Sequence, residues 1–163
     1  MSRSRPASRL QRPLVLATIW VVLVASLSAP AAAQGEINTG HFGNVAIQGY
    51  DPVAYFTERK AIKGSERHSH KWLGVVWRFA NEQHKQLFIA SPQTYAPQYG
   101  GHCASGLAIH GGLTKDIDPE AWAIIDNKLY LNYSKETNEL LTGKIVSLEK
   151  SEANWKKARP RAH

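Results

Sequence analysis

The chain has 163 residues, 43% of them hydrophobic and 20% charged, which is the composition of an ordinary globular domain. A single cysteine excludes internal disulfides and every metal site that needs several cysteines from one chain. The formal net charge of +7, from 20 Lys and Arg against 13 Asp and Glu, raises the question of a nucleic-acid or membrane-surface partner.

The first 33 residues have the organisation of a secretory signal peptide. Four arginines precede an apolar run at residues 13–27, and three alanines at residues 31–33 supply a cleavage site. The apolar run has 15 residues, whereas a membrane-spanning helix needs about 20. We therefore predict export by the general secretory route to the periplasm or the medium, with no membrane anchor after cleavage. An uncleaved anchor is the alternative.

Most of the excess positive charge lies in this leader and in the last residues of the chain. Residues 34–163 carry 16 Lys and Arg against 13 Asp and Glu, because the leader holds four arginines and no acidic residue. Four of these 16 bases lie in the last eight residues, so the body of the domain is near neutral. Binding to nucleic acid needs a dense basic face, and we predict no nucleic-acid partner.

We divide the chain into four segments and find no internal repeat in the sequence. They are a signal peptide (1–33), a flexible mature N-terminus (34–43), one folded domain (44–157) and a basic tail (158–163).

The first half of the domain contains turn and hairpin signals. Alternating apolar residues around Val45 and Val53 predict two short strands on either side of a turn. A β-hairpin follows at residues 69–79, with Gly74 at its turn and its aromatic residues on one face. Asn81 is then the expected N-cap of a helix.

The second half begins with an unusual segment. Residues 95–119 contain seven Gly and Pro residues and predict a long loop, of the kind that is usually functional or disordered. A second hairpin is predicted at residues 122–133, with Asp126 and Asn127 at a turn that requires positive φ. Two helices, at residues 134–143 and 145–155, complete a domain of the α+β class.

Five sequence blocks in the same order resemble exported YHS-domain proteins. The resemblance spans nearly all of the mature chain, and it implies a small YHS-type fold and a metal-binding role. The blocks are GYDPVAYF (49–56), WRFA (77–80), YGGHCA (99–104), DPEAW (118–122) and KLYLNY (128–133).

One departure from the resemblance matters for function. The YHS modules attached to heavy-metal ATPases carry thiolates at positions that resemble Ala54, Ala80 and His84 of this chain. Alanine has no donor atom, and His84, which we expect on the outer face of its helix, cannot hold a metal tightly alone. Any metal chemistry is therefore expected at Cys103 instead.

Cys103 is the leading candidate for a metal ligand. His102 is adjacent in sequence and His110 follows seven residues later, across the Gly-rich segment. A thiolate and two imidazoles form a ligand set for copper or zinc, with Asp116, Asp118 or water completing it. The predicted function is the storage or transfer of a soft transition metal in the cell envelope.

Two other functions stay open on the same residues. In the first, Cys103 is a small buried hydrophobe, and the domain is a non-catalytic module that binds a small molecule or a protein. In the second, Cys103 is a redox thiol, or a nucleophile with His102 or His110 as its base. His68 and His70 share one face of a strand, and we expect them on a solvated edge.

Overall fold

The structure, a computed structural model, describes residues 36–41 and 43–159. The predicted signal peptide lies outside the described residues, as do residues 34, 35 and 42 of the predicted flexible segment and residues 160–163 of the basic tail. No helix within the described ranges is long and apolar enough to cross a membrane.

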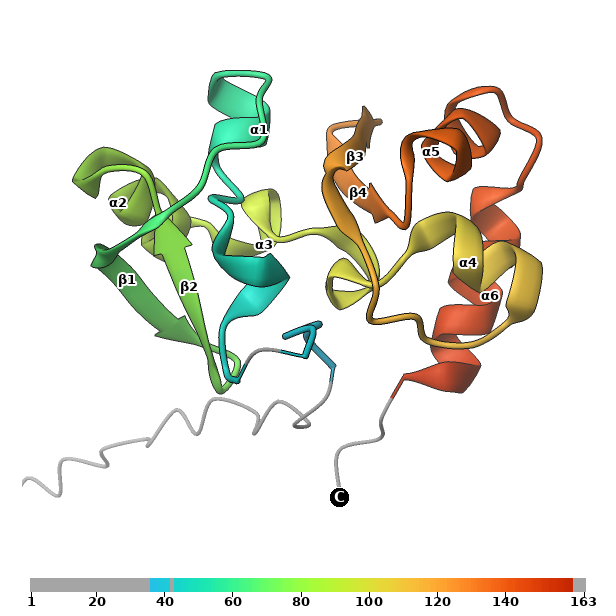
Figure 1. Ribbon diagram of the computed structural model, residues 1–163, viewed down its shortest axis with the longest axis horizontal. Helices are drawn as coiled ribbons and strands as arrows, with labels where there is room; N and C mark the ends of the chain where they lie inside the picture. Colours follow the sequence, from blue (N-terminus) through green and yellow to red (C-terminus); the bar gives the residue numbers. More distant parts are fainter. Residues whose placement is uncertain (1–35, 42, 160–163) are drawn as a thin grey trace, which may run out of the picture.

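Two lobes make up the fold, and each contains one antiparallel β-hairpin with helices around it (Figure 1). The predicted α+β class, with two hairpins and C-terminal helices, is confirmed. The first lobe contains the 3-10 helix η1 (Ala46–Gly49), then α1 (Ala54–Thr57), β1 (Ser65–Trp72), β2 (Val75–Phe79) and α2 (Glu82–Ala90). After α3 (Pro92–Tyr95), the second lobe contains the 3-10 helix η2 (Gln98–Gly101), then α4 (Ala104–His110), β3 (Asp118–Ile125), β4 (Lys128–Asn132), α5 (Lys135–Thr142) and α6 (Leu148–Ala158).

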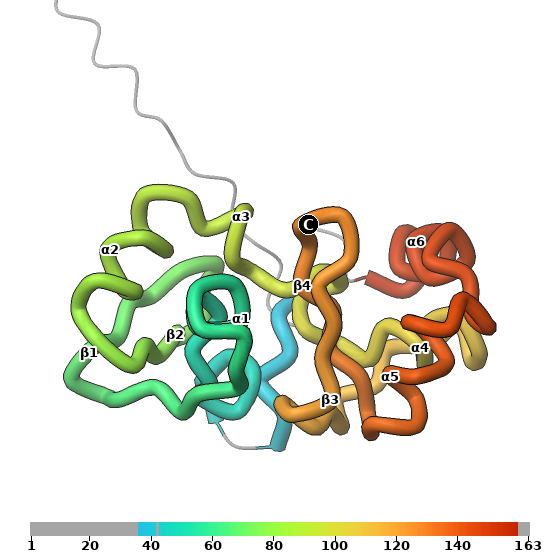
Figure 2. Tube along the Cα trace, turned by 90° about the horizontal axis from the view of Figure 1, so that it is seen from above, coloured from blue at the N-terminus to red at the C-terminus, as the bar shows by residue number. Residues whose placement is uncertain are grey.

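Buried Asn38 joins the two lobes from the segment that lies between them (Figure 2). Its backbone N–H donates to the carbonyl of Gly100 at 2.8 Å, and its carbonyl accepts from the N–H of Ile47 at 3.0 Å. Its side-chain amide donates to the carbonyls of Gly101 and Lys115, both at 2.9 Å. One residue therefore ties η1 to η2.

The two hairpins have the same construction. β1 and β3 have eight residues each, and β2 and β4 have five. The strand pairing is irregular between Ser65 and Ser69 in the first hairpin and between Asp118 and Trp122 in the second, at residues numbered 53 higher. Both turns consist of two residues with positive φ, which are Leu73 and Gly74 in the first hairpin and Asp126 and Asn127 in the second.

The correspondence extends to the helices on both sides of each hairpin. Three consecutive residues with left-handed backbone end both 3-10 helices, at 47–49 in η1 and at 99–101 in η2. After each hairpin, a side chain caps the next helix by accepting a backbone N–H bond. The caps are Asn81 before α2 and Ser134 before α5, again numbered 53 apart.

We call residues 46–90 the first unit and residues 98–142 the second unit. The sequence analysis found no internal repeat, whereas the backbone contains one. β2 reads VVWRF and β4 reads KLYLN, with no identical residue at corresponding positions. The two units thus share backbone geometry rather than side chains, and sequence similarity does not reveal it.

Two predicted elements differ from the observed ones. The segments predicted as strands around Val45 and Val53 contain η1 and α1, because the left-handed residues of η1 turn the chain away from an extended course. The predicted loop at residues 95–119 contains η2 and α4. Cys103 caps α4, and Gly111 ends it with φ 73°. A glycine that predicted a loop is therefore the end of a helix.

Aromatic side chains dominate the core. Trp77 and Phe79, predicted to share a face, are both fully buried and both lie against Phe88 of α2. In the second lobe, the ring of Tyr99 packs against that of Tyr130. These rings, together with aliphatic side chains such as Leu129 and Leu131, supply the hydrophobic contribution to the stability of the two lobes.

Candidate functional site

Cys103 is a buried hydrogen-bond acceptor between α4 and β4. Its side chain is 1% exposed, and its Sγ accepts the backbone N–H of Gly106 at 3.3 Å and of Tyr133 at 3.2 Å. The thiol also points to Oδ1 of Asn132, at 3.9 Å. That oxygen accepts the N–H of Ser105 at 3.0 Å, so Cys103 and Asn132 together hold the start of α4 against β4.

The two histidines predicted to join Cys103 differ in their surroundings. His102 is buried, with its Nδ1 3.2 Å from the carbonyl of Thr114 and its ring packed against Trp155. His110 is exposed at the far end of α4. Seven helical residues span about 10 Å, so His110 and the sulfur lie at opposite ends of the helix.

No group of three or more His, Cys, Asp or Glu side chains among residues 36–41 and 43–159 is arranged to hold a metal ion. Asp116, a predicted additional ligand, instead contacts the ring of His41 at 2.8 Å. Capture of copper or zinc by Cys103, His110 and His102 therefore stays a prediction. A nucleophilic or redox thiol must meet its substrate, and the enclosed sulfur of Cys103 offers no such access.

The position that corresponds to Cys103 in the first unit is Asp51, which is fully buried. Oδ1 of Asp51 accepts the N–H of Val53 at 2.8 Å and of Ala54 at 3.4 Å. Oδ2 accepts the N–H of Ala80 at 2.8 Å and lies 2.6 Å from Nδ1 of His84. The carboxylate of Asp51 thus holds the turn between the segments around Val45 and Val53 and also makes longer-range contacts.

Asp51 and Cys103 bind equivalent backbone groups. Ala54 follows Asp51 by three residues, as Gly106 follows Cys103, and both donate their N–H to the side chain. Ala80 follows the last residue of β2, as Tyr133 follows the last residue of β4, and both donate in the same way. A carboxylate and a thiol therefore perform one structural task in the two units.

His84 is buried, contrary to its predicted place on the outer face of α2. It is 6% exposed, because its Nδ1 donates to the carboxylate of Asp51. Its Nε2 lies 3.3 Å from Oγ1 of Thr57 and 3.6 Å from Oε1 of Glu58. The three positions that the YHS resemblance equates with thiolates, Ala54, Ala80 and His84, all bond to the carboxylate of Asp51.

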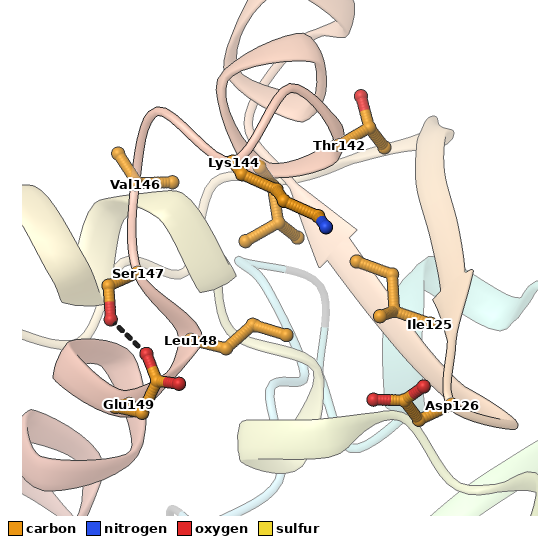
Figure 3. A pocket seen from close by; sticks show the side chains of 9 residues that line it. Ile125, Asp126, Thr142, Lys144, Val146, Ser147, Leu148 and Glu149 are labelled. Carbon is orange, nitrogen blue, oxygen red and sulfur yellow. Dashed lines mark hydrogen bonds between the residues drawn. The ribbon is translucent and has the colours of Figure 1, made fainter.

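A groove lies in the second lobe, between the turn of the β3–β4 hairpin, the end of α5 and the start of α6 (Figure 3). Its volume of about 480 Å³ falls in the range of small-molecule sites. Apolar side chains from three elements line it, namely Ile125, Leu141, Val146 and Leu148.

The corresponding corner of the first unit contains large aromatic residues. Trp72 and Phe88 stand at the positions of Ile125 and Leu141, and their rings meet edge to face with centroids 5.5 Å apart. Trp72 also lies against Trp77, with centroids 5.8 Å apart. The second unit replaces two large rings by two aliphatic side chains at the place where the groove lies.

No family model, curated protein or solved structure matches this chain. The YHS resemblance therefore stays a prediction.

Sequence reasoning missed both the groove and the buried Asp51–His84 pair. No local sequence signal marks the groove, because its lining comes from the hairpin turn, the end of α5 and the start of α6, and the comparison of Ile125 and Leu141 with Trp72 and Phe88 needs the backbone repeat. The Asp51–His84 contact joins residues 33 positions apart, and His84 has no local signal for burial because Gln83 and Lys85 beside it are polar.

Proposed function

We propose that this protein is an exported, non-catalytic binding module that takes a small molecule in the groove of its second lobe. The observation that carries the proposal is the replacement of Trp72 and Phe88 by Ile125 and Leu141 at corresponding positions, beside a space of about 480 Å³. Export to the periplasm or the medium rests on the signal-peptide pattern of residues 1–33.

The first unit acts as an internal control for this proposal. It has the same hairpin and the same capped helix, and its corner is packed with rings. A fold of this kind therefore needs no opening there for its stability. Sites for small molecules are concave and combine apolar walls with polar groups, and the groove of the second lobe has four apolar and five polar lining residues.

Cys103 has a structural role in the proposed module. Its sulfur binds the same backbone groups as the carboxylate of Asp51, and its side chain is enclosed. A single cysteine in an exported protein then needs no chemical activity to account for it.

The proposal is tested by filling the groove with the residues of the first unit. The variant carries Ile125→Trp and Leu141→Phe, and the probe is 3-methyl-1-butanol, titrated by amide chemical shifts. In the wild type, we expect saturable shifts confined to the β3–β4 turn, the end of α5 and residues 144–149. In the variant, we expect the affinity for the probe that these shifts report to fall at least tenfold, because the added rings occupy the apolar floor.

A matched control is Ile109→Trp, which adds a ring at a position that is 46% exposed and outside the groove. It should bind the probe like the wild type. Should the double variant fold and still give wild-type shifts, the groove is not the binding site and the proposal is wrong. If the double variant does not fold, Leu141→Phe alone makes the same test.

A further inference from the structure

Charged side chains of both signs surround the apolar floor of the groove. Asp126 lies in the β3–β4 turn, Lys144 in the connection between α5 and α6, and Glu149 in the first turn of α6. Figure 3 shows Lys144 and Asp126 on the side of the groove near Ile125, and Glu149 on the other side, with its carboxylate directed to the hydroxyl of Ser147. The groove therefore offers both charges to one ligand.

These charged side chains do not neutralise one another. Within the part of the chain that the structure describes, Lys144 and Asp126 form no ion pair, and Glu149 accepts a hydrogen bond from the hydroxyl of Ser147. That bond lowers the pKa of Glu149 below its usual value, so its carboxylate is charged at neutral pH. A ligand that brings a cation and an anion finds a counter-charge for each.

The backbone conformation is fixed at Asp126 and Lys144, two of the three residues that carry these charges. Asp126 has φ 49° in a two-residue hairpin turn, and Lys144 has φ 58° in a connection held by backbone bonds. The N–H of Lys144 donates to the carbonyl of Leu141 at 3.1 Å, and the N–H of Ile145 donates to that of Leu140 at 2.9 Å. A site on a fixed backbone loses less conformational entropy when a ligand binds.

We infer that the ligand of this groove is a small aliphatic zwitterion, a free amino acid with a branched apolar side chain. Its carboxylate is bound by Lys144, its ammonium by Asp126, and its side chain by the floor at Ile125 and Leu141. This inference rests on the proposed function and adds the chemical class of the ligand.

The test compares four probes with the same branched side chain. L-leucine carries both charges, leucinamide only the positive charge, N-acetyl-leucine only the negative charge, and 3-methyl-1-butanol none. With chemical-shift titrations on the wild type, we expect L-leucine to bind about fivefold more tightly than either singly charged probe, which is the upper end for one exposed ion pair. The neutral alcohol should bind most weakly.

Single-charge variants assign each contact without disturbing the core. Lys144→Met should remove the advantage of L-leucine over leucinamide, and Asp126→Asn should reduce its advantage over N-acetyl-leucine. Asparagine also accepts the positive φ of that turn. Lys150→Met is the matched control, because Lys150 is exposed on α6 and does not line the groove.

The possible outcomes separate this inference from the proposed function. If all four probes bind equally well and the groove-filling variant weakens all of them, the inference is overturned while the binding groove stands. If L-leucine binds best but the groove-filling variant leaves its affinity unchanged, both the groove and the inference are wrong. A fivefold preference that Lys144→Met removes supports both.

Discussion

The two units of this protein place different chemistry at one structural position. In the first unit, the buried carboxylate of Asp51 holds two backbone segments and pairs with His84. In the second unit, the sulfur of Cys103 holds the corresponding segments, and a neutral amide, Asn132, stands beside it. The difference teaches that a lone buried cysteine can serve as a hydrogen-bond acceptor in the fold, where the sequence alone favours a metal ligand.

The comparison also predicts where the fold is most sensitive to mutation. Asp51→Ala removes the acceptor of three backbone N–H groups and leaves His84 without its buried partner. Each buried donor left without its acceptor costs about 1–3 kcal/mol, so we expect this variant to lose most of the stability of a domain of this size. Urea denaturation followed by tryptophan fluorescence measures the change.

A matched control for Asp51→Ala is Glu58→Ala. Glu58 lies 3.6 Å from the other ring nitrogen of His84, but its side chain is 42% exposed. An exposed contact of this kind contributes less than about 1 kcal/mol. If the two variants were equally destabilised, the burial of Asp51 would not be the cause, and the first unit would not depend on its carboxylate.

The second unit should be less sensitive at the corresponding position. Cys103→Ala leaves the N–H groups of Gly106 and Tyr133 without an acceptor, which costs about 1–3 kcal/mol. Cys103→Ser keeps an acceptor and a preferred helix cap, so its loss should be smaller by about 1 kcal/mol. Equal losses in the two variants would mean that the sulfur acts through packing rather than as an acceptor.

The same serine variant decides the metal prediction. If Cys103 has only a structural role, the wild type and Cys103→Ser bind Cu(I) and zinc equally weakly in competition with a chelator. Metal binding that is strong in the wild type and lost in the variant would replace the binding-module proposal by metal handling through this cysteine.

Local signals in the sequence predicted the parts of the fold that depend on neighbouring residues. Gly74 and the Asp126–Asn127 pair marked both hairpin turns, and Asn81 and Ser134 marked two helix starts. All of these positions owe their conformation to backbone φ or to a bond within three residues.

Contacts between residues far apart in the chain could not be predicted from local sequence signals. The Asp51–His84 contact spans 33 residues, and the repeat is carried by a backbone pattern that different side chains can adopt. The charges that line the groove come from the hairpin turn, the α5–α6 connection and the start of α6, so no single stretch of sequence places them together. Helix α4 could have been predicted from a local signal, because Gly111, which lies in the predicted loop, is a typical residue for a helix end.

The smallest effect that we predict concerns the exposed charges of the first unit. Glu82 accepts hydrogen bonds from Lys85 at 2.8 Å and Gln86 at 2.8 Å, and Nδ1 of His68 lies 3.3 Å away. These bonds, with Lys85 the largest cause, lower the pKa of Glu82 from 4.5 to about 2. At the corresponding position, α5 has Lys135 and no acid.

A lowered pKa in the folded state stabilises the fold only while the carboxylate is charged. The contribution of Glu82 is therefore present above pH 4.5 and is lost as the pH falls toward about 2. Glu82→Gln should flatten the curve of unfolding free energy against pH in this range and leave it parallel to the wild type above pH 5. Because the side chain of Glu82 is 53% exposed, the change is small, and curves that stay parallel throughout would show that solvent screens these contacts completely.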